Sequence, residues 1–153
     1  MSPSEGTLLG APLLDGSAMS QILEARCSDL IRTLDRFHLI SAHDGLVILK
    51  NSISAPKLLY TLRCSPTSEH HLLDRFDQNL RLGLSRLANI HVNDLNWIQA
   101  SLPVKDGGLG IRSVGLLAPS AFLASAAATQ DLQAQLLPVG CPSDPYVDNV
   151  LGV

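Results

Sequence analysis

The sequence predicts an all-α protein, a multi-helix bundle of about five to seven helices with an irregular N-terminus and a disordered C-terminal tail. Apolar residues recur at three- and four-residue spacing between residues 17 and 137, the pattern of helices with one buried face. No stretch alternates apolar and polar residues over a run long enough to indicate a strand ladder. Because proline and glycine gather at both ends, residues 1–16 are expected to form an irregular lead-in and residues 138–153 a tail, around one helical domain over 17–137.

Two stretches have the clearest apolar stripes. One helix is expected from about Ser17 to Phe37, and the longest helix is expected to begin at Ser68 and Glu69. The stripe expected for the first is Leu23, Cys27, Leu30, Ile31, Leu34 and Phe37. The stripe expected for the longest is Leu72, Leu73, Phe76, Leu80, Leu84 and Leu87.

Shorter helices fill the rest of the domain. Serine, asparagine and proline mark their first turns, because these residues cap or start helices. The expected segments are Ser41 or His43 to Lys50, Ala55 to Arg63, Asn93 to Leu102, Ser113 to Ala128 with a break possible at Pro119, and a further helix over 129–137.

A glycine-rich turn joins the last two parts of the domain, after the aromatic anchor Trp97. Gly107, Gly108 and Gly110 allow positive φ and close backbone approach, so the loop is expected to turn sharply and press Leu109 and Ile111 into a core. A phosphate-cradling loop is the alternative. The dinucleotide fingerprint would need a further glycine and a preceding strand, and no Gly-Lys-Ser/Thr follows, so the structural turn is favoured.

Composition limits the class of protein. A chain of 153 residues is long enough for one domain with one core. Hydrophobic residues make up 46% of it and charged residues 16%, with a mean hydropathy of +0.21. We therefore expect that a partner covers part of the surface or that the chain is a piece of something larger.

The sequence also indicates a location. No apolar run approaches the roughly 18 residues of a membrane span, and no basic region followed by an apolar one marks a secretory signal. Cys27, Cys64 and Cys141 are an odd, widely spaced set, which fits reduced thiols better than a disulfide framework. An intracellular protein of the cytoplasm or nucleus, without membrane contact, is expected.

The basic residues are confined to the middle of the chain. All 11 lie between Arg26 and Arg112, so this region is mildly basic although the whole chain has a net charge of −3. If those on successive helices converge, they would contact phosphates without reading sequence. The alternative is a solvated polar face opposite each apolar stripe. The candidate nucleic-acid-binding residues are Lys50, Lys57, Arg63, Arg75, Arg81, Arg86, Lys105 and Arg112.

Other constellations give no site. Asp74 and Asp77 could hold a metal between them, but the nearby Arg75 and Arg81 favour a salt-bridged helix surface. The histidines lack zinc-ligand spacing, and no Gly-x-Ser-x-Gly elbow occurs. No catalytic residue, metal or cofactor is therefore expected.

Several short motifs occur in a recognisable order. They are Ala11-Pro-Leu-Leu-Asp-Gly16, His43-Asp-Gly-Leu-Val-Ile-Leu-Lys50, Ala55-Pro-Lys-Leu-Leu-Tyr-Thr-Leu-Arg63, Phe76-Asp-Gln-Asn-Leu-Arg81, Gln99-Ala-Ser-Leu-Pro-Val-Lys-Asp-Gly-Gly-Leu-Gly-Ile111 and Leu117-Ala-Pro-Ser-Ala-Phe-Leu-Ala124. Over about residues 7–137 the chain resembles the segment that follows the polymerase domain in reverse transcriptases of non-LTR retrotransposons. In that family a Trp, a variable loop and a Gly-Gly-Leu-Gly-Ile element recur downstream of the thumb.

The resemblance implies a function. The turn Leu9-Gly10 would correspond to the primer grip, and the helices after it to a thumb that holds the template–primer duplex. No Tyr/Phe-x-Asp-Asp motif of the catalytic palm is present, so no enzymatic activity is expected of this chain. We expect a C-terminal fragment of a reverse transcriptase-like protein with a noncatalytic role in template–primer handling. The alternatives are a free-standing helical interaction module, binding itself or another protein through its apolar surface, and a nonfunctional relic of an element.

Overall fold

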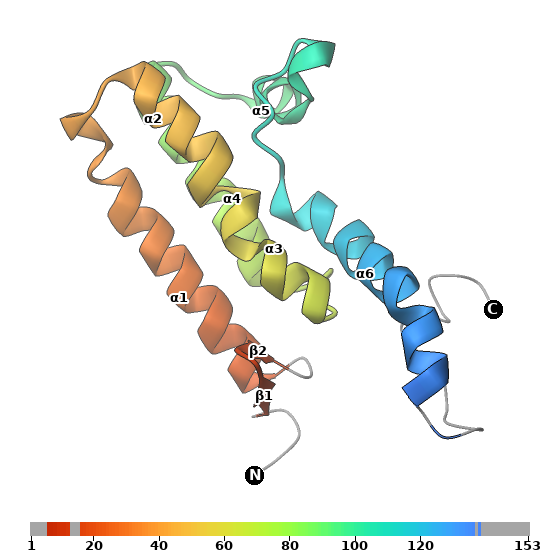
Figure 1. The fold of residues 1–153 in the computed structure, drawn as a ribbon. Coiled ribbons are helices and arrows are strands. Elements are labelled where there is room, and N and C mark those ends of the chain that lie inside the picture. The colour runs from red at the N-terminus through yellow and green to blue at the C-terminus, as the bar shows by residue number, and fades with distance from the viewer. Residues whose placement is uncertain (1–5, 13–15, 137, 139–153) are drawn as a thin grey trace.

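The fold is all-α, as the sequence predicts (Figure 1). The computed structural model describes residues 6–12, 16–136 and 138, so the predicted tail lies almost wholly outside the described residues. In chain order the elements are β1 (Thr7–Leu8), β2 (Ala11–Pro12), α1 (Ser17–Leu34), η2 (Phe37–Leu39), α2 (Ala42–Ile48), η3 (Leu49–Ile53), α3 (Ala55–Cys64), α4 (His71–Ala88), α5 (Asp94–Ser101), η4 (Val104–Asp106) and α6 (Val114–Leu136).

The N-terminal lead-in is more regular than predicted. β1 and β2 pair as an antiparallel hairpin, with Leu8 opposite Ala11. Leu9 and Gly10 form its two-residue turn with φ of 51° and 82°, the left-handed pair that matches the twist of a hairpin. The Tyr60 hydroxyl of α3 donates to the Leu9 carbonyl over 2.8 Å, which holds the turn against the helices. The sequence did not predict this hairpin, because strands of two residues are too short to show an alternation of apolar and polar residues.

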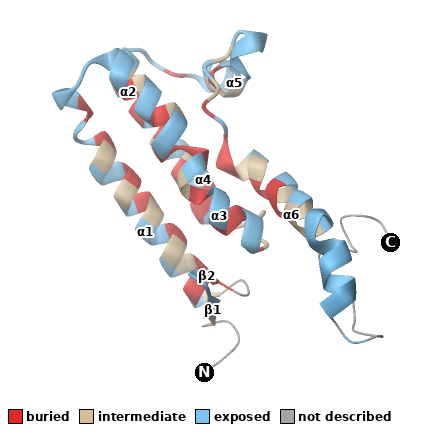
Figure 2. Ribbon diagram, in the orientation of Figure 1, coloured by how far each residue is buried: buried red, intermediate tan, exposed pale blue. Residues whose placement is uncertain are grey.

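The core lies between α1, α3, α4 and the first half of α6 (Figure 2). The predicted stripe of α4 is buried from Leu72 to Leu84, with Leu87 partly buried, and most of the predicted stripe of α1 is buried with it. Ile31 is the exception at 38% exposed. Gly83 faces Leu34, whose Cδ2 would lie 2.5 Å from a Cβ at that position, so α4 gains close packing on α1 where its sequence weakens the helix.

Three predicted helix boundaries are wrong. α1 ends at Leu34, and Phe37 of its predicted stripe belongs to the separate helix η2. α4 begins at His71 and not at Ser68, because the Nδ1 of His70 accepts the Leu72 N–H and so caps the helix. α6 has 23 residues against 18 in α4, so α6 is the longer helix. It continues without a break through the region predicted as a separate helix. Pro119 removes only one backbone hydrogen bond, and the alanine-rich sequence after it favours helix strongly enough to continue.

The carboxylate of Asp77 on α4 caps the first turn of α6. Ser113 Oγ donates to Asp77 Oδ2 over 2.6 Å, and the amides of Val114 and Gly115 donate to Asp77 Oδ1 and Oδ2 over 2.8 and 3.2 Å. Ser113 in turn accepts the Leu116 amide over 3.2 Å, which makes it the predicted cap. The predicted salt-bridged role of Asp77 is wrong: its partners are the donors at a helix N-terminus, which attract negative charge.

Burial sets the electrostatics of this cap. Desolvation raises the pKa of Asp77 above its ordinary value of 3.8, while the hydrogen bonds from Ser113, Val114 and Gly115 lower it and nearby Asp74 raises it. The net direction is upward, so burial outweighs the hydrogen bonds.

The glycine turn reverses the chain as predicted, but Gly108 and Leu109 differ from their predicted roles. Gly107 and Gly110 have φ of 83° and 73°, but Gly108 has no positive φ. A Cβ on Gly108 would lie 2.1 Å from the Leu102 carbonyl oxygen, so glycine is needed there for close approach. Ile111 is fully buried, whereas Leu109 is 39% exposed, so only one of the two predicted side chains enters the core.

Replacing Gly108 by alanine should destabilise the fold by more than about 3 kcal/mol, because the new methyl meets backbone atoms that have no room to move. Gly107→Asn is the matched control. Nothing lies within 4 Å of a Cβ at Gly107, and asparagine adopts its left-handed conformation readily. Urea denaturation of both variants measures the difference, and equal midpoints for Gly108→Ala and the wild type would contradict the close approach.

Asp77→Ala should lower the free energy of unfolding by about 1–3 kcal/mol, because the Ser113 hydroxyl and two amides lose their acceptor. The control Asp74→Ala removes an exposed carboxylate one turn earlier in α4. It should change the free energy of unfolding by less than about 0.5 kcal/mol. Similar losses in the two variants, measured by urea denaturation, would show that Asp77 is not the cap that holds α6.

The same carboxyl should make stability depend on pH. Because its pKa is raised on folding, Asp77 binds its proton more tightly in the folded chain than in the unfolded one. This difference in proton binding stabilises the folded chain fully below pH 3.8, the ordinary pKa of the carboxyl. The stabilisation is lost as pH rises through the pKa of the folded state. The difference in unfolding free energy between the wild type and Asp77→Asn should therefore fall with rising pH from about 3 and then level off. A difference that stays constant, or rises, over that range would contradict the raised pKa.

Candidate functional site

Half of the predicted nucleic-acid-binding residues form ion pairs within the chain. Their charges are partly neutralised, and such surface pairs contribute only about 0–1 kcal/mol each to stability. The pairs are Lys57 Nζ with Asp29 Oδ2 at 4.0 Å, Arg75 Nη1 with Glu24 Oε1 at 2.8 Å, Arg81 Nη1 with Asp94 Oδ1 at 2.6 Å and Arg86 Nη1 with Asp35 Oδ1 at 3.4 Å. Arg81 also donates from Nε to the Val92 carbonyl over 2.7 Å, so it tethers the connection between α4 and α5.

The other half are Lys50, Arg63, Lys105 and Arg112. Within the described parts of the chain, none of these four forms an ion pair. Lys50 and Arg112 come from segments far apart in the sequence and line one pocket, whereas Arg63 and Lys105 do not line it. The structure therefore brings together two of the eight predicted residues at a defined site.

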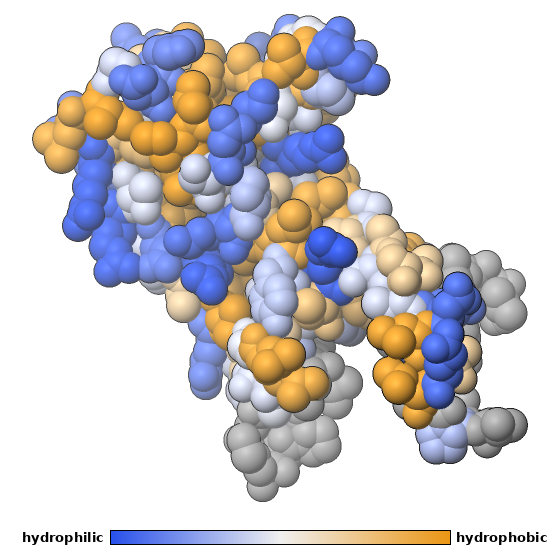
Figure 3. All heavy atoms as spheres, in the orientation of Figure 1, coloured by the Kyte–Doolittle hydropathy of each residue, from blue (hydrophilic) through white to orange (hydrophobic). Residues whose placement is uncertain are grey.

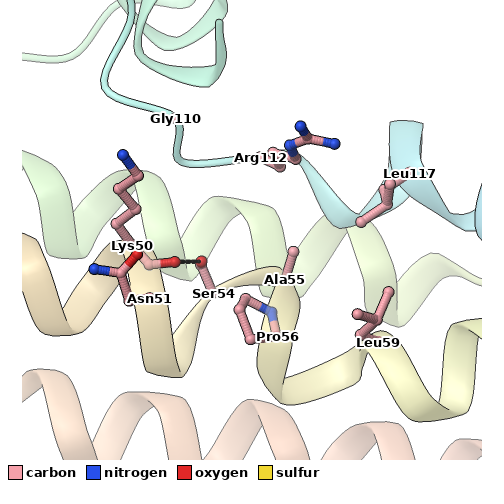
Figure 4. A pocket seen from close by; sticks show the side chains of 9 residues that line it. All are labelled: Lys50, Asn51, Ser54, Ala55, Pro56, Leu59, Gly110, Arg112 and Leu117. Carbon is pink, nitrogen blue, oxygen red and sulfur yellow. Dashed lines mark hydrogen bonds between the residues drawn. The ribbon is translucent and has the colours of Figure 1, made fainter. Parts of the chain in front are cut away.

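We call this site the Lys50–Arg112 pocket. It has a volume of about 360 Å³ and lies between η3, the start of α3, the segment that leads into α6 and the first turn of α6 (Figure 4). Its lining residues are Lys50, Asn51, Ser54, Ala55, Pro56, Leu59, Gly110, Arg112 and Leu117. The side chains of Ala55, Leu59 and Leu117 face one another from α3 and α6, and the two cationic side chains lie at its upper edge in the view. No acidic residue is among those that line it.

Lys50 is held in place by the glycine turn. The lysine is half-buried, and its Cε and Nζ would lie 3.0 and 3.2 Å from a Cβ at Gly110. Gly110 therefore provides the room in which the lysine side chain passes the backbone. The hydroxyl of buried Ser54 donates to the Lys50 carbonyl over 2.8 Å and fixes the turn between η3 and α3.

Arg112 is positioned by its two neighbours. Ile111 is fully buried in the core, and Ser113 is buried at the N-terminus of α6, where it bonds Asp77. Arg112, between them, is exposed. Its backbone is therefore fixed on both sides while its guanidinium remains free to meet a ligand.

The start of α3 borders the pocket. Ser54, at the N-cap position, makes no side-chain hydrogen bond to the first turn, because its hydroxyl bonds Lys50 instead. The first turn also has no acidic residue. η3 ends at Ile53, directly before Ser54, so the carbonyl end of η3 lies beside the start of α3 and opposes its dipole.

A second hollow is mostly apolar, with Asn96, Gln99 and His43 as the polar side chains of its lining. Two adjoining pockets of about 240 and 320 Å³ share Leu84, Ala88 and Leu109 and lie between α2, α4, α5 and the glycine turn. We call them together the α2–α4 groove. Apolar side chains are also exposed on the neighbouring surface over α2 (Figure 3), where Val47 and Ile48 are among the exposed hydrophobic residues. Sequence reasoning missed this groove, because the α4 stripe that forms its floor has the same pattern as a fully covered core face.

The remaining candidate motifs have structural roles. Trp97 is partly buried and packs on the core, as expected of an anchor. His70 caps α4, and its ring stacks on that of His71 with centroids 4.8 Å apart. Burial raises the pKa of Cys27, which makes its thiol a weak nucleophile.

The described residues contain no group of three or more histidines, cysteines, aspartates or glutamates placed to hold a metal ion. In the same residues, no helix has the length and apolar character that crossing a membrane requires.

No protein-family model, curated protein or solved structure matches this chain. The resemblance to reverse transcriptases therefore stays a prediction from the sequence motifs.

Proposed function

We propose that this chain binds the phosphate backbone of nucleic acid through Lys50 and Arg112, as a noncatalytic template–primer handling part of a reverse transcriptase-like protein. The observation that carries the proposal is the convergence of two cations without acidic partners on one pocket. Arg63 and Lys105, which are exposed, add to the positive field that attracts the polyanion. The sequence resemblance supplies the kind of protein in which such a contact would serve.

The proposal assigns different roles to the eight basic residues. Phosphate contacts release counterions from the nucleic acid, and a cation already paired with a carboxylate contributes less to that release. Arg75 and Arg86, both ion-paired, thus become controls, although the sequence pattern alone places them among the first residues to test.

Binding of a fluorescently labelled duplex, followed by anisotropy, should weaken steeply as salt rises from 50 to 200 mM. The double variant Lys50→Gln/Arg112→Gln should reduce the slope of log K against log salt by about 1.8, the value for two phosphate contacts. Arg75→Gln/Arg86→Gln removes the same charge from paired positions and should change the slope by less than half as much. Equal effects of the two double variants, or binding independent of salt, would contradict the proposal.

The α2–α4 groove favours a second function, that of a helical protein-interaction module. Its lining is mostly apolar and extends onto exposed apolar surface, which is typical of a protein-binding region. In this function the chain binds itself or another protein, and the groove is covered in the complex.

Sedimentation equilibrium tests self-association through the groove. If the groove joins two copies, the mass should rise with concentration, and Leu109→Lys should return the chain to a monomer. A monomer throughout the micromolar to millimolar range would remove self-association and leave the nucleic-acid function ahead.

A further inference from the structure

We propose that the Lys50–Arg112 pocket holds one unpaired nucleotide, with phosphate at its cationic edge and the sugar and base against the apolar wall. This inference rests on the proposed function and specifies which part of the nucleic acid enters the molecule. The juxtaposition that carries it is one cationic edge and one apolar wall in a hollow of limited size.

The charges suit a phosphate. Lys50 is half-buried, and its ammonium group forms no ion pair or hydrogen bond within the part of the chain that the structure describes. An anion bound in the pocket would give this ammonium group a charged partner. Arg112 lines the same pocket, and no acidic residue does. Together they favour a group with more than one negative oxygen, because an arginine fork and an ammonium bind separate oxygens.

The wall suits a base and sugar. Ala55, Pro56, Leu59 and Leu117 line the pocket below the cations, from two helices that face each other. Its volume of about 360 Å³ is near the lower end of the range of about 300–1,000 Å³ for small-molecule pockets, so it fits one such unit. A paired base lies stacked within its duplex, and it would have to leave the duplex to enter the pocket. The occupant is therefore a nucleotide of a single strand or of an unpaired end.

The pocket should tolerate any base. Beyond the two cations, the side chains with hydrogen-bonding groups along its lining are Asn51 and Ser54, and the Ser54 hydroxyl already donates to the Lys50 carbonyl. Contacts with the face of a base do not depend on its identity, whereas recognition of base edges needs paired donors and acceptors. We expect oligonucleotides of different sequence to bind with similar affinity.

The test compares a labelled 12-nucleotide single strand with a blunt duplex of the same sequence. The variant Leu59→Ser removes part of the apolar wall without changing charge, and Leu59 is already 38% exposed, so the fold should survive. It should weaken single-strand binding about fivefold and leave duplex binding unchanged. Leu116→Ser is the matched control, because Leu116 is 82% exposed on α6 and does not line the pocket. It should change neither affinity.

Competition against the same labelled strand identifies what enters the pocket. A free 5′-mononucleotide should displace the strand at lower concentration than inorganic phosphate, and a hexaglutamate peptide should compete no better than phosphate. If phosphate competes as well as the mononucleotide, the apolar wall takes no part and the inference is overturned. If the peptide competes best, the pocket binds carboxylates and the inference also fails.

The outcomes separate this inference from the proposed function. Equal losses of single-strand and duplex affinity in Leu59→Ser would overturn the nucleotide pocket while salt-dependent backbone binding stood. Absence of salt-dependent binding to either nucleic acid would overturn both.

Discussion

The cap that Asp77 of α4 forms on α6 is the interaction on which the rest of the structure depends. It provides acceptors for two amides and a hydroxyl at the start of the longest helix, groups that would otherwise be left without partners at a half-buried end. Because α6 packs on α3 as well as on α4, this cap fixes the relation of three helices. It also fixes Ser113, and with it the backbone of Arg112. The pocket that Arg112 shares with Lys50 thus exists only while α6 is held in this position.

The glycine turn completes the arrangement from the other side. The Gly108 backbone lies against the Leu102 carbonyl, and the amides of Leu109 and Ile111 both donate to the Ala100 carbonyl over 3.1 Å. The chain therefore reverses tightly after α5 and enters the core at Ile111. Trp97 and Ala100 pack α5 on the core, and Arg81 holds its N-terminal end through the Val92 carbonyl and Asp94, so the turn acts together with these contacts. The same turn leaves room for Lys50 at Gly110, which couples the fold to the cationic edge of the pocket.

Sequence periodicity predicted what depends on local spacing. The stripes of α1 and α4, the asparagine cap of α5 and the serine cap of α6 follow from the types of neighbouring residues, and the structure confirms them. It did not predict partners that are distant in the chain. Asp77 looked like one half of a helix-surface salt bridge, because its bonds to Ser113 and Val114 depend on how α4 meets α6. The division of the basic residues into paired and unpaired groups has the same cause, since Glu24 reaches Arg75 only across the α1–α4 contact.

The measurement that tests the central claim most directly is a map of backbone amide shifts in the ¹⁵N-labelled chain during titration with a single-stranded oligonucleotide. We predict that the largest shifts fall on Lys50, Asn51, Ala55, Gly110 and Arg112, the amides around the pocket that the Asp77 cap and the glycine turn hold in place. Amides of the ion-paired residues Arg75 and Arg86 should move little. Shifts centred on the α2–α4 groove, or on α4 around Arg75 and Arg86, would contradict the account.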